Sequence, residues 1–348
     1  MKLAIIALTE SGRALAKSLG EKLEEAEIYL PVKLAEGEDI HSFDTTLREL
    51  VAKLFKEYDA LVFIMALGIV VRVIAPYLAD KRRDPAVLTI DETGQNVIST
   101  LSGHLGGANS LTEKIATLIG ANPVISTATD CHGKLAIDLL AQRLDCEIIP
   151  FENLKLANSA IVNDKTLNIF TDYHLELDED EDDNINLYPL KELGQKEGFP
   201  VIITNKAIKA IDLSVEYLQL VPKNIILGIG CRKGISVTEV EEAISYALEK
   251  LQLRRESIKA LATVDLKKKE RGIIEATHSL EVPLNIISRA EIKRVDFEYT
   301  SSEFVKEKIG VGGVCEPVAI LSAKNPQLLL PKTIKGRVTV AVVEESFM

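Results

Sequence analysis

The stretch Leu101-Ser-Gly-His-Leu-Gly-Gly-Ala-Asn109 decides how this sequence is interpreted. Before it, the apolar run at residues 86–90 predicts a buried strand. After it, apolar residues recur at helical spacing from Leu105 to Leu118. A glycine-rich turn that opens a helix offers backbone N–H groups and the positive end of the helix dipole to an anion. The stretch therefore predicts an anion-binding turn, and a tight turn that only packs the helix against a sheet remains the alternative.

The segments on either side predict the fold class. Apolar runs predict strands at residues 3–8, 27–30, 61–65, 86–90 and 124–125, and amphipathic patterns between them predict helices. This alternation predicts an α/β fold with a mostly parallel sheet and helices on both faces. Ligands of such sheets bind outside the carboxyl ends of the strands. We therefore expect Gly68, residues 89–94 and residues 102–109 to line one cleft.

The length of 348 residues exceeds what one core holds, about 250–300 residues. The pattern changes near Pro150, and we predict an N-terminal α/β domain at 1–150, a small middle module at 151–221 and a second α/β domain at 222–348. Three capping boxes predict helix starts in this last domain. They are Ser236-Val-Thr-Glu239, Ser288-Arg-Ala-Glu291 and Thr300-Ser-Ser-Glu303.

The charge is acidic but unevenly distributed. Of the formal net charge of −11, eight negative charges lie between Asp172 and Asp183, which predicts a solvated loop. The chain has no tryptophan and no basic stripe, so the composition excludes a nucleic-acid-binding protein. The longest apolar run, residues 60–71, is shorter than the roughly 20 residues that span a bilayer.

The four cysteines are scattered and form no C-x-x-C pair. This distribution argues against a structural zinc site and against disulfides, and it is typical of a reducing cytoplasm. The apolar N-terminus runs directly into a turn at Thr9, so we expect a first strand there rather than a signal peptide. We expect a cytoplasmic protein without a membrane segment and without a metal site of its own. The cysteines are Cys131, Cys146, Cys231 and Cys315.

His104 is the candidate general acid or base. It stands where the helix begins, and we expect Asp91 or Glu92 from the same cleft to orient it. A helix N-terminus lowers the pKa of a histidine, which would keep the imidazole neutral. The alternative is a capping or merely exposed histidine.

Two groups of basic residues are candidate clamps for carboxylates, with solvated loops as the commoner alternative. One group is Arg72, Lys81, Arg82 and Arg83; the other is Arg232 and Lys233, followed by residues 267–270. Cys231 beside Arg232 is either a thiolate with a lowered pKa or a small residue that fills the turn.

Taken together, these segments resemble the cobalt-precorrin-5A hydrolases, the CbiG family of cobalamin biosynthesis. The resemblance rests on the stretch 101–109 and on the following segments: Gly68-Ile-Val-Val-Arg72, Ala75-Pro76, Asp84-Pro-Ala-Val87, Asp91-Glu92, Thr127-Ala-Thr-Asp130, Gly228-Ile-Gly-Cys-Arg232, Leu266-Lys267 with Glu270, and Val311-Gly-Gly-Val-Cys-Glu316. It covers nearly the whole chain, except for residues 151–221.

The resemblance implies that water opens the δ-lactone of cobalt-precorrin-5A and that a two-carbon unit leaves as acetaldehyde. The product would be cobalt-precorrin-5B, and the cobalt would come with the substrate, so no cofactor is expected. We hypothesise that the tetrapyrrole lies between the N- and C-terminal domains. In this hypothesis His104 with Asp91 or Glu92 activates water, and the N–H groups of Gly106 and Gly107 stabilise the oxyanion.

The many carboxylates of a corrinoid would account for the basic residues and glycine turns. The predicted substrate-binding residues are Arg72, Lys81, Ser102, Gly103, Gly106, Gly107, Asn109, Asp130, Gly230, Cys231, Arg232, Lys267, Glu270 and Glu316. A non-catalytic tetrapyrrole chaperone that serves precorrin methyltransferases is the alternative. A flavodoxin-like or nucleotide-binding regulator is disfavoured, because the glycines match neither G-x-G-x-x-G nor the Walker pattern. The sequence leaves the oligomeric state open, a homodimer included.

Overall fold

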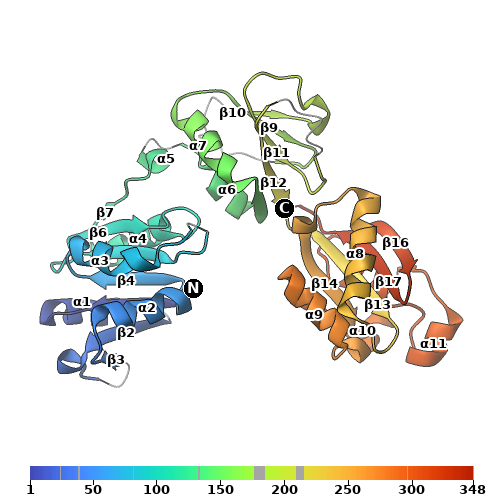
Figure 1. Ribbon diagram of the computed structural model, residues 1–348, viewed down its shortest axis with the longest axis horizontal. Helices are drawn as coiled ribbons and strands as arrows, with labels where there is room; N and C mark the ends of the chain where they lie inside the picture. Colours follow the sequence, from blue (N-terminus) through green and yellow to red (C-terminus); the bar gives the residue numbers. More distant parts are fainter. Residues whose placement is uncertain are drawn as a thin grey trace. The chain divides into compact units, whose positions relative to one another are not determined.

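The computed structural model describes residues 1–23, 25–37, 40–80, 82–131, 134–175, 185–208, 215–295 and 297–347. Contacts divide the chain into two compact units, Met1–Leu139 and Leu140–Met348. The first unit contains a seven-stranded sheet, and the second contains two five-stranded sheets (Figure 1). The predicted α/β class is confirmed.

The sheet of the first unit has the order β3-β2-β1-β4-β5-β6-β7. All neighbouring strands pair in parallel except β5 and β6. The strands are β1 (Leu3–Ala7), β2 (Ala26–Pro31), β3 (Ile40–Phe43), β4 (Ala60–Ile64), β5 (Ala86–Ile90), β6 (Asn96–Leu101) and β7 (Asn122–Val124). The helices are α1 (Glu10–Gly20), α2 (Leu47–Glu57), α3 (Leu67–Ile74), α4 (Ala108–Ile119) and α5 (Ala128–Cys131), with the 3-10 turns η1 (Val32–Leu34) and η2 (Ala75–Tyr77). Helix α6 (Ile137–Arg143) begins in the first unit and ends in the second.

Helices cover both faces of this sheet, as a mostly parallel sheet requires, and alternate side chains of each strand pack against one face or the other. On one face, Leu3 and Ile5 of β1 belong to the same buried core as α1 and α4. On the other face, Ala4 and Ile6 pack in a core with α2 and α3. The predicted coverage of both faces is therefore confirmed.

The reversed strand β6 determines where the glycine-rich loop lies. The connection from β5 to β6 has only five residues, whereas a parallel crossover needs a dozen or more, so β6 returns antiparallel. The loop at 102–107 therefore lies at the amino end of β5, where Ser102 Oγ donates to the carbonyl of Asp84 at 3.0 Å. Gly68 and residues 91–94 lie at the carboxyl ends of β4 and β5. The expectation of a single cleft is wrong, because the sequence patterns predicted no strand at 96–101, and the antiparallel β6 carries the loop to the other end of the sheet.

The second unit begins with the sheet β10-β9-β11-β12-β8. Its strand β8 is antiparallel to β12 and places Cys146 opposite Pro222, so the chain enters and leaves this sheet side by side. We predicted a first domain at residues 1–150, which includes β8, whereas β8 pairs with β12 in the middle sheet. The elements are β8 (Cys146–Ile149), η3 (Phe151–Asn153), α7 (Leu154–Val162), β9 (Leu167–Thr171), β10 (Ile185–Tyr188), η4 (Leu190–Glu192), β11 (Phe199–Ile203) and β12 (Leu218–Pro222).

The last sheet has the order β15-β14-β13-β17-β16. Helices α8 and α9 pack in a core on one face of β13, and α10 and α12 pack on the other. The elements are β13 (Ile225–Cys231), α8 (Val237–Leu251), η6 (Arg255–Ser257), β14 (Ile258–Val264), η7 (Asp265–Lys267), α9 (Arg271–Leu280), β15 (Leu284–Ile287), α10 (Arg289–Ile292), α11 (Glu303–Ile309), α12 (Cys315–Leu321), β16 (Gln327–Lys335) and β17 (Val338–Glu344).

Two of the three predicted capping boxes are confirmed. Ser236 and Ser288 each accept from the N–H of the glutamate three residues later, and that glutamate accepts in return. The third box is wrong: Thr300 Oγ1 donates to Glu316 Oε1 at 2.9 Å, and Ser302 stands before α11 instead. A distant buried carboxylate has displaced the local partner.

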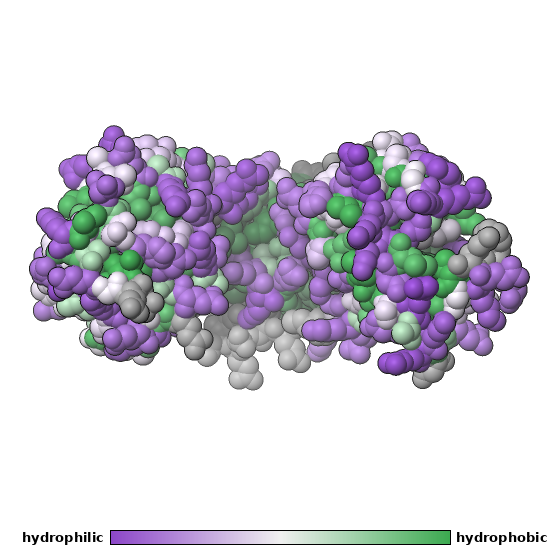
Figure 2. Space-filling model, turned by 90° about the horizontal axis from the view of Figure 1, so that it is seen from below, coloured by the Kyte–Doolittle hydropathy of each residue, from purple (hydrophilic) through white to green (hydrophobic). Residues whose placement is uncertain are grey.

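The helix lengths and the surface agree with the expectation that the chain has no membrane segment. In the part of the chain that the structure describes, no helix is long and apolar enough to cross a membrane. Figure 2 shows hydrophilic residues interspersed with smaller hydrophobic areas on one face. Of the acidic run, residues 176–183 lie outside the described residues, and Asp172 Oδ1 accepts from the N–H of Leu190 at 3.2 Å.

Candidate functional site

The loop at 102–107 is a tightly closed turn between β6 and α4. Ser102 has a φ of 58° and Gly107 a φ of 81°, both left-handed. A Cβ on Gly106 would lie 2.4 Å from the Cβ of Ser102, so only glycine fits there. The sequence therefore needs its small residues to turn this sharply.

This turn uses much of its own hydrogen-bonding capacity. Helix α4 begins at Ala108, and the N–H groups of Gly107 and Ala108 donate to the carbonyls of His104 and Ser102 at 2.8 and 3.1 Å. The Gly107 N–H is therefore not available as the oxyanion donor that we predicted. The N–H of Gly106 has no hydrogen-bond partner among the described residues.

His104 is buried between two carboxylates, with 7% of its side chain exposed. Its Nε2 lies 2.6 Å from Asp130 Oδ2, and its Nδ1 lies 3.0 Å from Asp138 Oδ2. The hydroxyl of Thr129 lies 3.2 Å from Nε2. Helices α5 and α6 thus supply the acids, and we call Asp130, His104 and Asp138 the acid–histidine–acid cluster.

The predicted pairing of His104 with Asp91 or Glu92 is wrong. Asp91 holds the hairpin between β5 and β6, where its carboxylate accepts from the N–H groups of Thr93 at 2.9 Å and Asn96 at 2.7 Å. Partial burial raises the pKa of Asp91, but these hydrogen bonds outweigh burial and lower it to about 2. Glu92 is exposed on the same turn.

The electrostatics of His104 also differ from the expectation. Burial lowers the pKa of the imidazole, but the hydrogen bonds and charges of Asp138 and Asp130 outweigh burial, so its pKa is raised. The helix N-terminus does not set this value, since α4 starts four residues later. With a carboxylate at each ring nitrogen, the imidazolium form can donate to both.

Asn109 links this cluster to the sheet. Its Nδ2 donates to Asp130 Oδ2 at 3.1 Å and to Thr127 Oγ1 at 3.0 Å, and its Oδ1 accepts from Ser99 Oγ at 2.6 Å. A Cβ on Gly103 would lie 2.8 Å from Asn109 Oδ1, which explains the glycine. Gly103, Asn109 and Asp130, predicted as substrate-binding residues, thus meet in one network, and their binding roles stay predictions.

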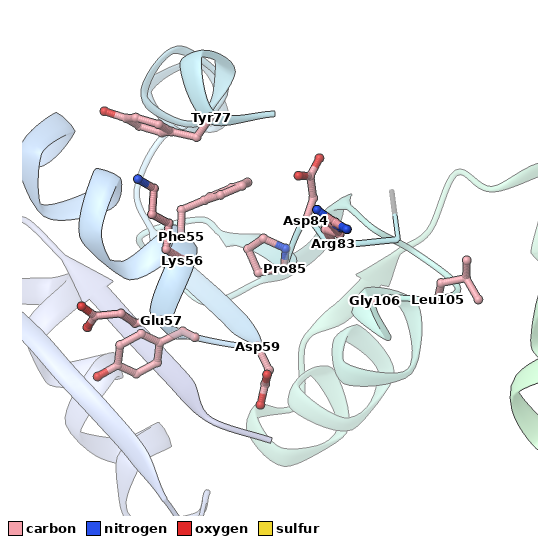
Figure 3. Close-up of a pocket in the computed structure, with 11 residues that line it drawn as sticks. Phe55, Lys56, Glu57, Asp59, Tyr77, Arg83, Asp84, Pro85, Leu105 and Gly106 are labelled. Atoms are coloured by element: carbon pink, nitrogen blue, oxygen red, sulfur yellow. The ribbon is translucent and has the colours of Figure 1, made fainter. Parts of the chain in front are cut away.

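A pocket of about 560 Å³ adjoins the loop at the amino ends of β4 and β5. Figure 3 shows Leu105 and Gly106 on one side of it and Phe55 and Lys56 on the other. The pocket combines aromatic rings, two cationic side chains and three carboxylates. Its lining residues are Phe55, Lys56, Glu57, Tyr58, Asp59, Tyr77, Arg83, Asp84, Pro85, Leu105 and Gly106.

The first group of basic residues does not gather into one clamp. Arg72 is exposed on α3, where its Nη1 donates to the carbonyl of Gly68 at 2.8 Å. It follows the carboxyl end of β4, so it lies at the opposite edge of the sheet from the 102–107 loop. Arg82 pairs with Asp80. Lys81 lies outside the described residues.

In the second unit, the glycines of β13 serve packing. A Cβ on Gly228 would lie 1.8 Å from the carbonyl oxygen of Cys315, and one on Gly230 would lie 2.5 Å from Thr339 Oγ1. These glycines let α12 and β17 approach the strand. Burial raises the pKa of the Cys231 thiol to about 11, which favours the packing alternative over the thiolate.

The charged residues near Cys231 hold the loop after β13. Lys267 Nζ lies 3.2 Å from Glu270 Oε2, and Glu270 Oε1 accepts from the N–H of Gly234 at 2.7 Å. Arg232 is exposed and forms no ion pair within the described ranges. The substrate contacts of these residues stay predictions.

Glu316 is a buried carboxylate with 3% of the residue exposed. It accepts from the N–H groups of Thr300 at 2.5 Å and Lys332 at 2.6 Å. These bonds explain why a charged residue is tolerated in the core, and they tie α12 to the loop at Thr300 and to strand β16. Its predicted contact with substrate stays a prediction.

Across the described residues, no group of three or more His, Cys, Asp or Glu side chains is arranged to hold a metal ion. The two carboxylates of the acid–histidine–acid cluster bind opposite nitrogens of the ring, so they do not converge on one point.

Sequence reasoning missed Asp138. The only local signal is that Asp138 interrupts the apolar run at 135–141, where a charged residue needs a buried partner.

The fold and site define a modular α/β protein that carries a buried acid–histidine–acid cluster beside a pocket. Three family descriptions match the chain in order: Cobalamin synthesis G N-terminal at 49–130, Cobalamin biosynthesis central region at 135–222, and Cobalamin synthesis G C-terminus at 225–343. The chain belongs to the cobalamin synthesis G family, and the resemblance seen in the sequence is confirmed.

Relatives match over nearly their whole length. The cobalt-precorrin-5A hydrolase of Priestia megaterium is 33% identical, over 97% of this chain and 94% of that protein. The cobalt-precorrin-5A hydrolase of Salmonella typhimurium is 34% identical, over 96% of this chain and 94% of that protein. A solved cobalamin biosynthesis protein G homolog from Sulfolobus solfataricus is 26% identical, with 98% of this chain and 96% of that chain covered and a TM-score of 0.38.

Proposed function

We propose that this protein hydrolyses cobalt-precorrin-5A to cobalt-precorrin-5B and acetaldehyde. Relatives with that name, matched over nearly the full length, support the reaction. The observation within the molecule that carries the proposal is the acid–histidine–acid cluster beside a pocket. Buried charged groups of this kind are expensive to maintain, and they cluster at catalytic sites.

The chemistry of the reaction needs a proton carrier. Hydrolysis of a lactone requires a base to take a proton from water during attack on the carbonyl, and an acid to protonate the leaving oxygen. Acetaldehyde can only arise from a carbon that carries the lactone oxygen and a methyl group. The freed hydroxyl then loses its proton and becomes the aldehyde oxygen. The C–C bond to the macrocycle breaks, and its electron pair and a proton pass to the ring.

This sequence of steps needs no oxidant and no cofactor, and the cobalt belongs to the substrate. Lys56 and Arg83 at the pocket provide cations for the carboxylates of a corrinoid, and the contacts of Arg72 and Arg232 stay predictions. The protein works in the cytoplasm and exchanges its unstable intermediates with precorrin methyltransferases.

The test is acetaldehyde release from cobalt-precorrin-5A, measured with an aldehyde trap. The unmodified protein releases acetaldehyde, and His104→Ala loses about 10²–10⁴-fold in rate. His278→Ala, at an exposed histidine of α9, is the matched control and keeps the normal rate. A normal rate from His104→Ala would contradict the site assignment. If the unmodified protein binds the corrinoid and releases no aldehyde, the protein is a carrier and not an enzyme.

A further inference from the structure

The three members of the acid–histidine–acid cluster differ in their access to solvent. The side chains of His104 and Asp138 are 7% and 6% exposed, whereas that of Asp130 is 29% exposed. Only one end of the cluster can therefore meet a substrate or a water molecule. This difference separates the group that does chemistry from the groups behind it.

The two carboxylate oxygens of Asp130 have different surroundings. Oδ2 accepts from His104 Nε2 at 2.6 Å and from Asn109 Nδ2 at 3.1 Å. Oδ1 has no hydrogen-bond partner in the part of the chain that the structure describes. One oxygen is thus fixed by two donors, and the other keeps its lone pairs for an incoming group.

His104 lacks a free nitrogen for the same task. Nε2 faces Asp130 and Nδ1 faces both oxygens of Asp138, at 3.1 and 3.0 Å. A histidine that accepts a proton from water needs an unoccupied ring nitrogen within reach of that water. His104 could act directly only after breaking one of these bonds.

We propose that Asp130, through Oδ1, is the catalytic residue that exchanges protons with water and with the lactone oxygen, and that His104 and Asp138 are positioning residues. This assignment rests on the proposed function and reverses the sequence-based one, in which His104 is catalytic and Asp130 binds substrate. Asp138 holds the imidazole ring through Nδ1, and the ring then holds Asp130 through Nε2.

The proton balance closes on one atom. As the water oxygen bonds to the lactone carbonyl carbon, its proton passes to Asp130 Oδ1 and the carbonyl electron pair moves to oxygen. When the acyl C–O bond breaks, Oδ1 returns that proton to the leaving oxygen. The same oxygen then takes the proton of the new hydroxyl as acetaldehyde departs, and it gives that proton to the macrocycle carbon.

The experiment measures steady-state acetaldehyde release in Asp130→Asn, Asp138→Asn, His104→Gln and a control variant. The imidazole ¹⁵N NMR signals of His104 are compared in the three variants that keep this histidine. Asp130→Asn should lower kcat about 10²–10⁴-fold with little change in KM. Asp138→Asn should lower kcat by less, about 10–100-fold, and should shift the His104 signals, because Nδ1 loses its charged partner. Asp44→Asn is the matched control, since Asp44 is an exposed aspartate of the same unit that belongs neither to the cluster nor to the pocket lining, and it should keep kcat and the signals unchanged.

The outcomes are distinct. Asp130→Asn with normal kcat overturns the assignment, as does a much larger kcat loss for His104→Gln than for Asp130→Asn. Unchanged His104 signals in Asp138→Asn overturn the positioning role. No acetaldehyde from the unmodified protein overturns the proposed function itself. Thermal unfolding of each variant separates these effects from loss of the fold.

Discussion

The two glycine-rich segments of this chain, residues 102–107 and 228–234, look alike in sequence and differ in the structure. Each combines glycines with a reactive side chain and precedes a helix. The first closes around the Asn109 network and leaves one oxygen of Asp130 without a partner among the residues that the structure describes. The second brings α12 and β17 against β13, and its neighbouring Glu270 is used to hold the loop.

This difference shows that a glycine-rich segment indicates close packing of the backbone against a neighbour, and not by itself a ligand site. The identity of that neighbour determines the effect of a substitution. At Gly106 the neighbour is Ser102 within the same loop, so a change there acts locally. At Gly228 it is the backbone of Cys315 at the start of a buried helix, so a change there acts on a whole core.

The largest effect is expected for Gly228→Ala. The added Cβ would sit 1.8 Å from a backbone carbonyl that cannot move alone, so the free energy of unfolding should fall by more than about 4 kcal/mol. Denaturant unfolding measures this. Gly234→Ala is the control, because its φ is +73° but nothing lies within 4 Å, and it should cost only about 1–2 kcal/mol. An equal loss of unfolding free energy in Gly228→Ala and Gly234→Ala would contradict the packing role assigned to Gly228.

Gly106→Ala should separate activity from stability. The loop must shift to admit the Cβ, which moves His104 and the pocket wall, and shifts of about 1 Å can cost 100-fold in rate. The midpoint of unfolding should change little, since the added Cβ meets only Ser102 of the same turn. Acetaldehyde release and thermal unfolding are the two measurements. If both fall together, the first segment is a packing element like the second.

The buried charge of the first segment should make stability depend on pH. The pKa of His104 is raised in the folded state above the usual value of about 6.5, so the imidazolium stabilises the fold at low pH. This contribution is complete below about pH 6.5 and is lost as the pH rises through the folded-state pKa. The difference in unfolding free energy between the unmodified protein and His104→Gln should therefore narrow from pH 6 to pH 9.

Asp138→Asn provides the comparison for this pH dependence. It removes the carboxylate that raises the pKa of His104 most, so the pKa of His104 is raised less in this variant. The difference in unfolding free energy between Asp138→Asn and the double variant Asp138→Asn/His104→Gln should therefore change less from pH 6 to pH 9. A difference between the unmodified protein and His104→Gln that widens with pH would contradict the sign of the shift.

The smallest effects are expected for the exposed arginines. Arg72→Ala and Arg232→Ala should each raise KM a few-fold and leave kcat unchanged, because exposed ion pairs contribute only about 0–1 kcal/mol. Steady-state kinetics on the corrinoid tests this. Unchanged KM in both variants would exclude these two residues from substrate binding, and the clamp would then have to be sought at the pocket cations.

The local patterns of the sequence predicted the elements well. The apolar runs predicted β1, β4 and β5, and the capping boxes predicted the starts of α8 and α10, because these signals depend on neighbouring residues. The glycine-rich pattern also predicted that His104 lies in a short loop before a helix. The strand β6 was not predicted, because residues 96–101 mix polar and apolar side chains and form no continuous apolar run.

The partners of His104 were not predictable for a related reason. Asp138 lies 34 residues away in the sequence, and its contact depends on how α6 folds back onto the loop. Asp91 was a reasonable choice by distance along the chain, but its own hairpin uses its oxygens first. Long-range contacts and local competition for hydrogen bonds together explain the wrong assignment.

The antiparallel pairing of β8 with β12 has a consequence for how this chain can be rearranged. The N–H of Lys223 donates to the carbonyl of Asp145 at 3.0 Å, so the middle module starts and ends at neighbouring points. A segment whose two ends lie side by side can be removed or replaced by another segment, because a short turn can join the flanking residues. The gene could thus gain, lose or replace this stretch without redesign of the flanking sheets.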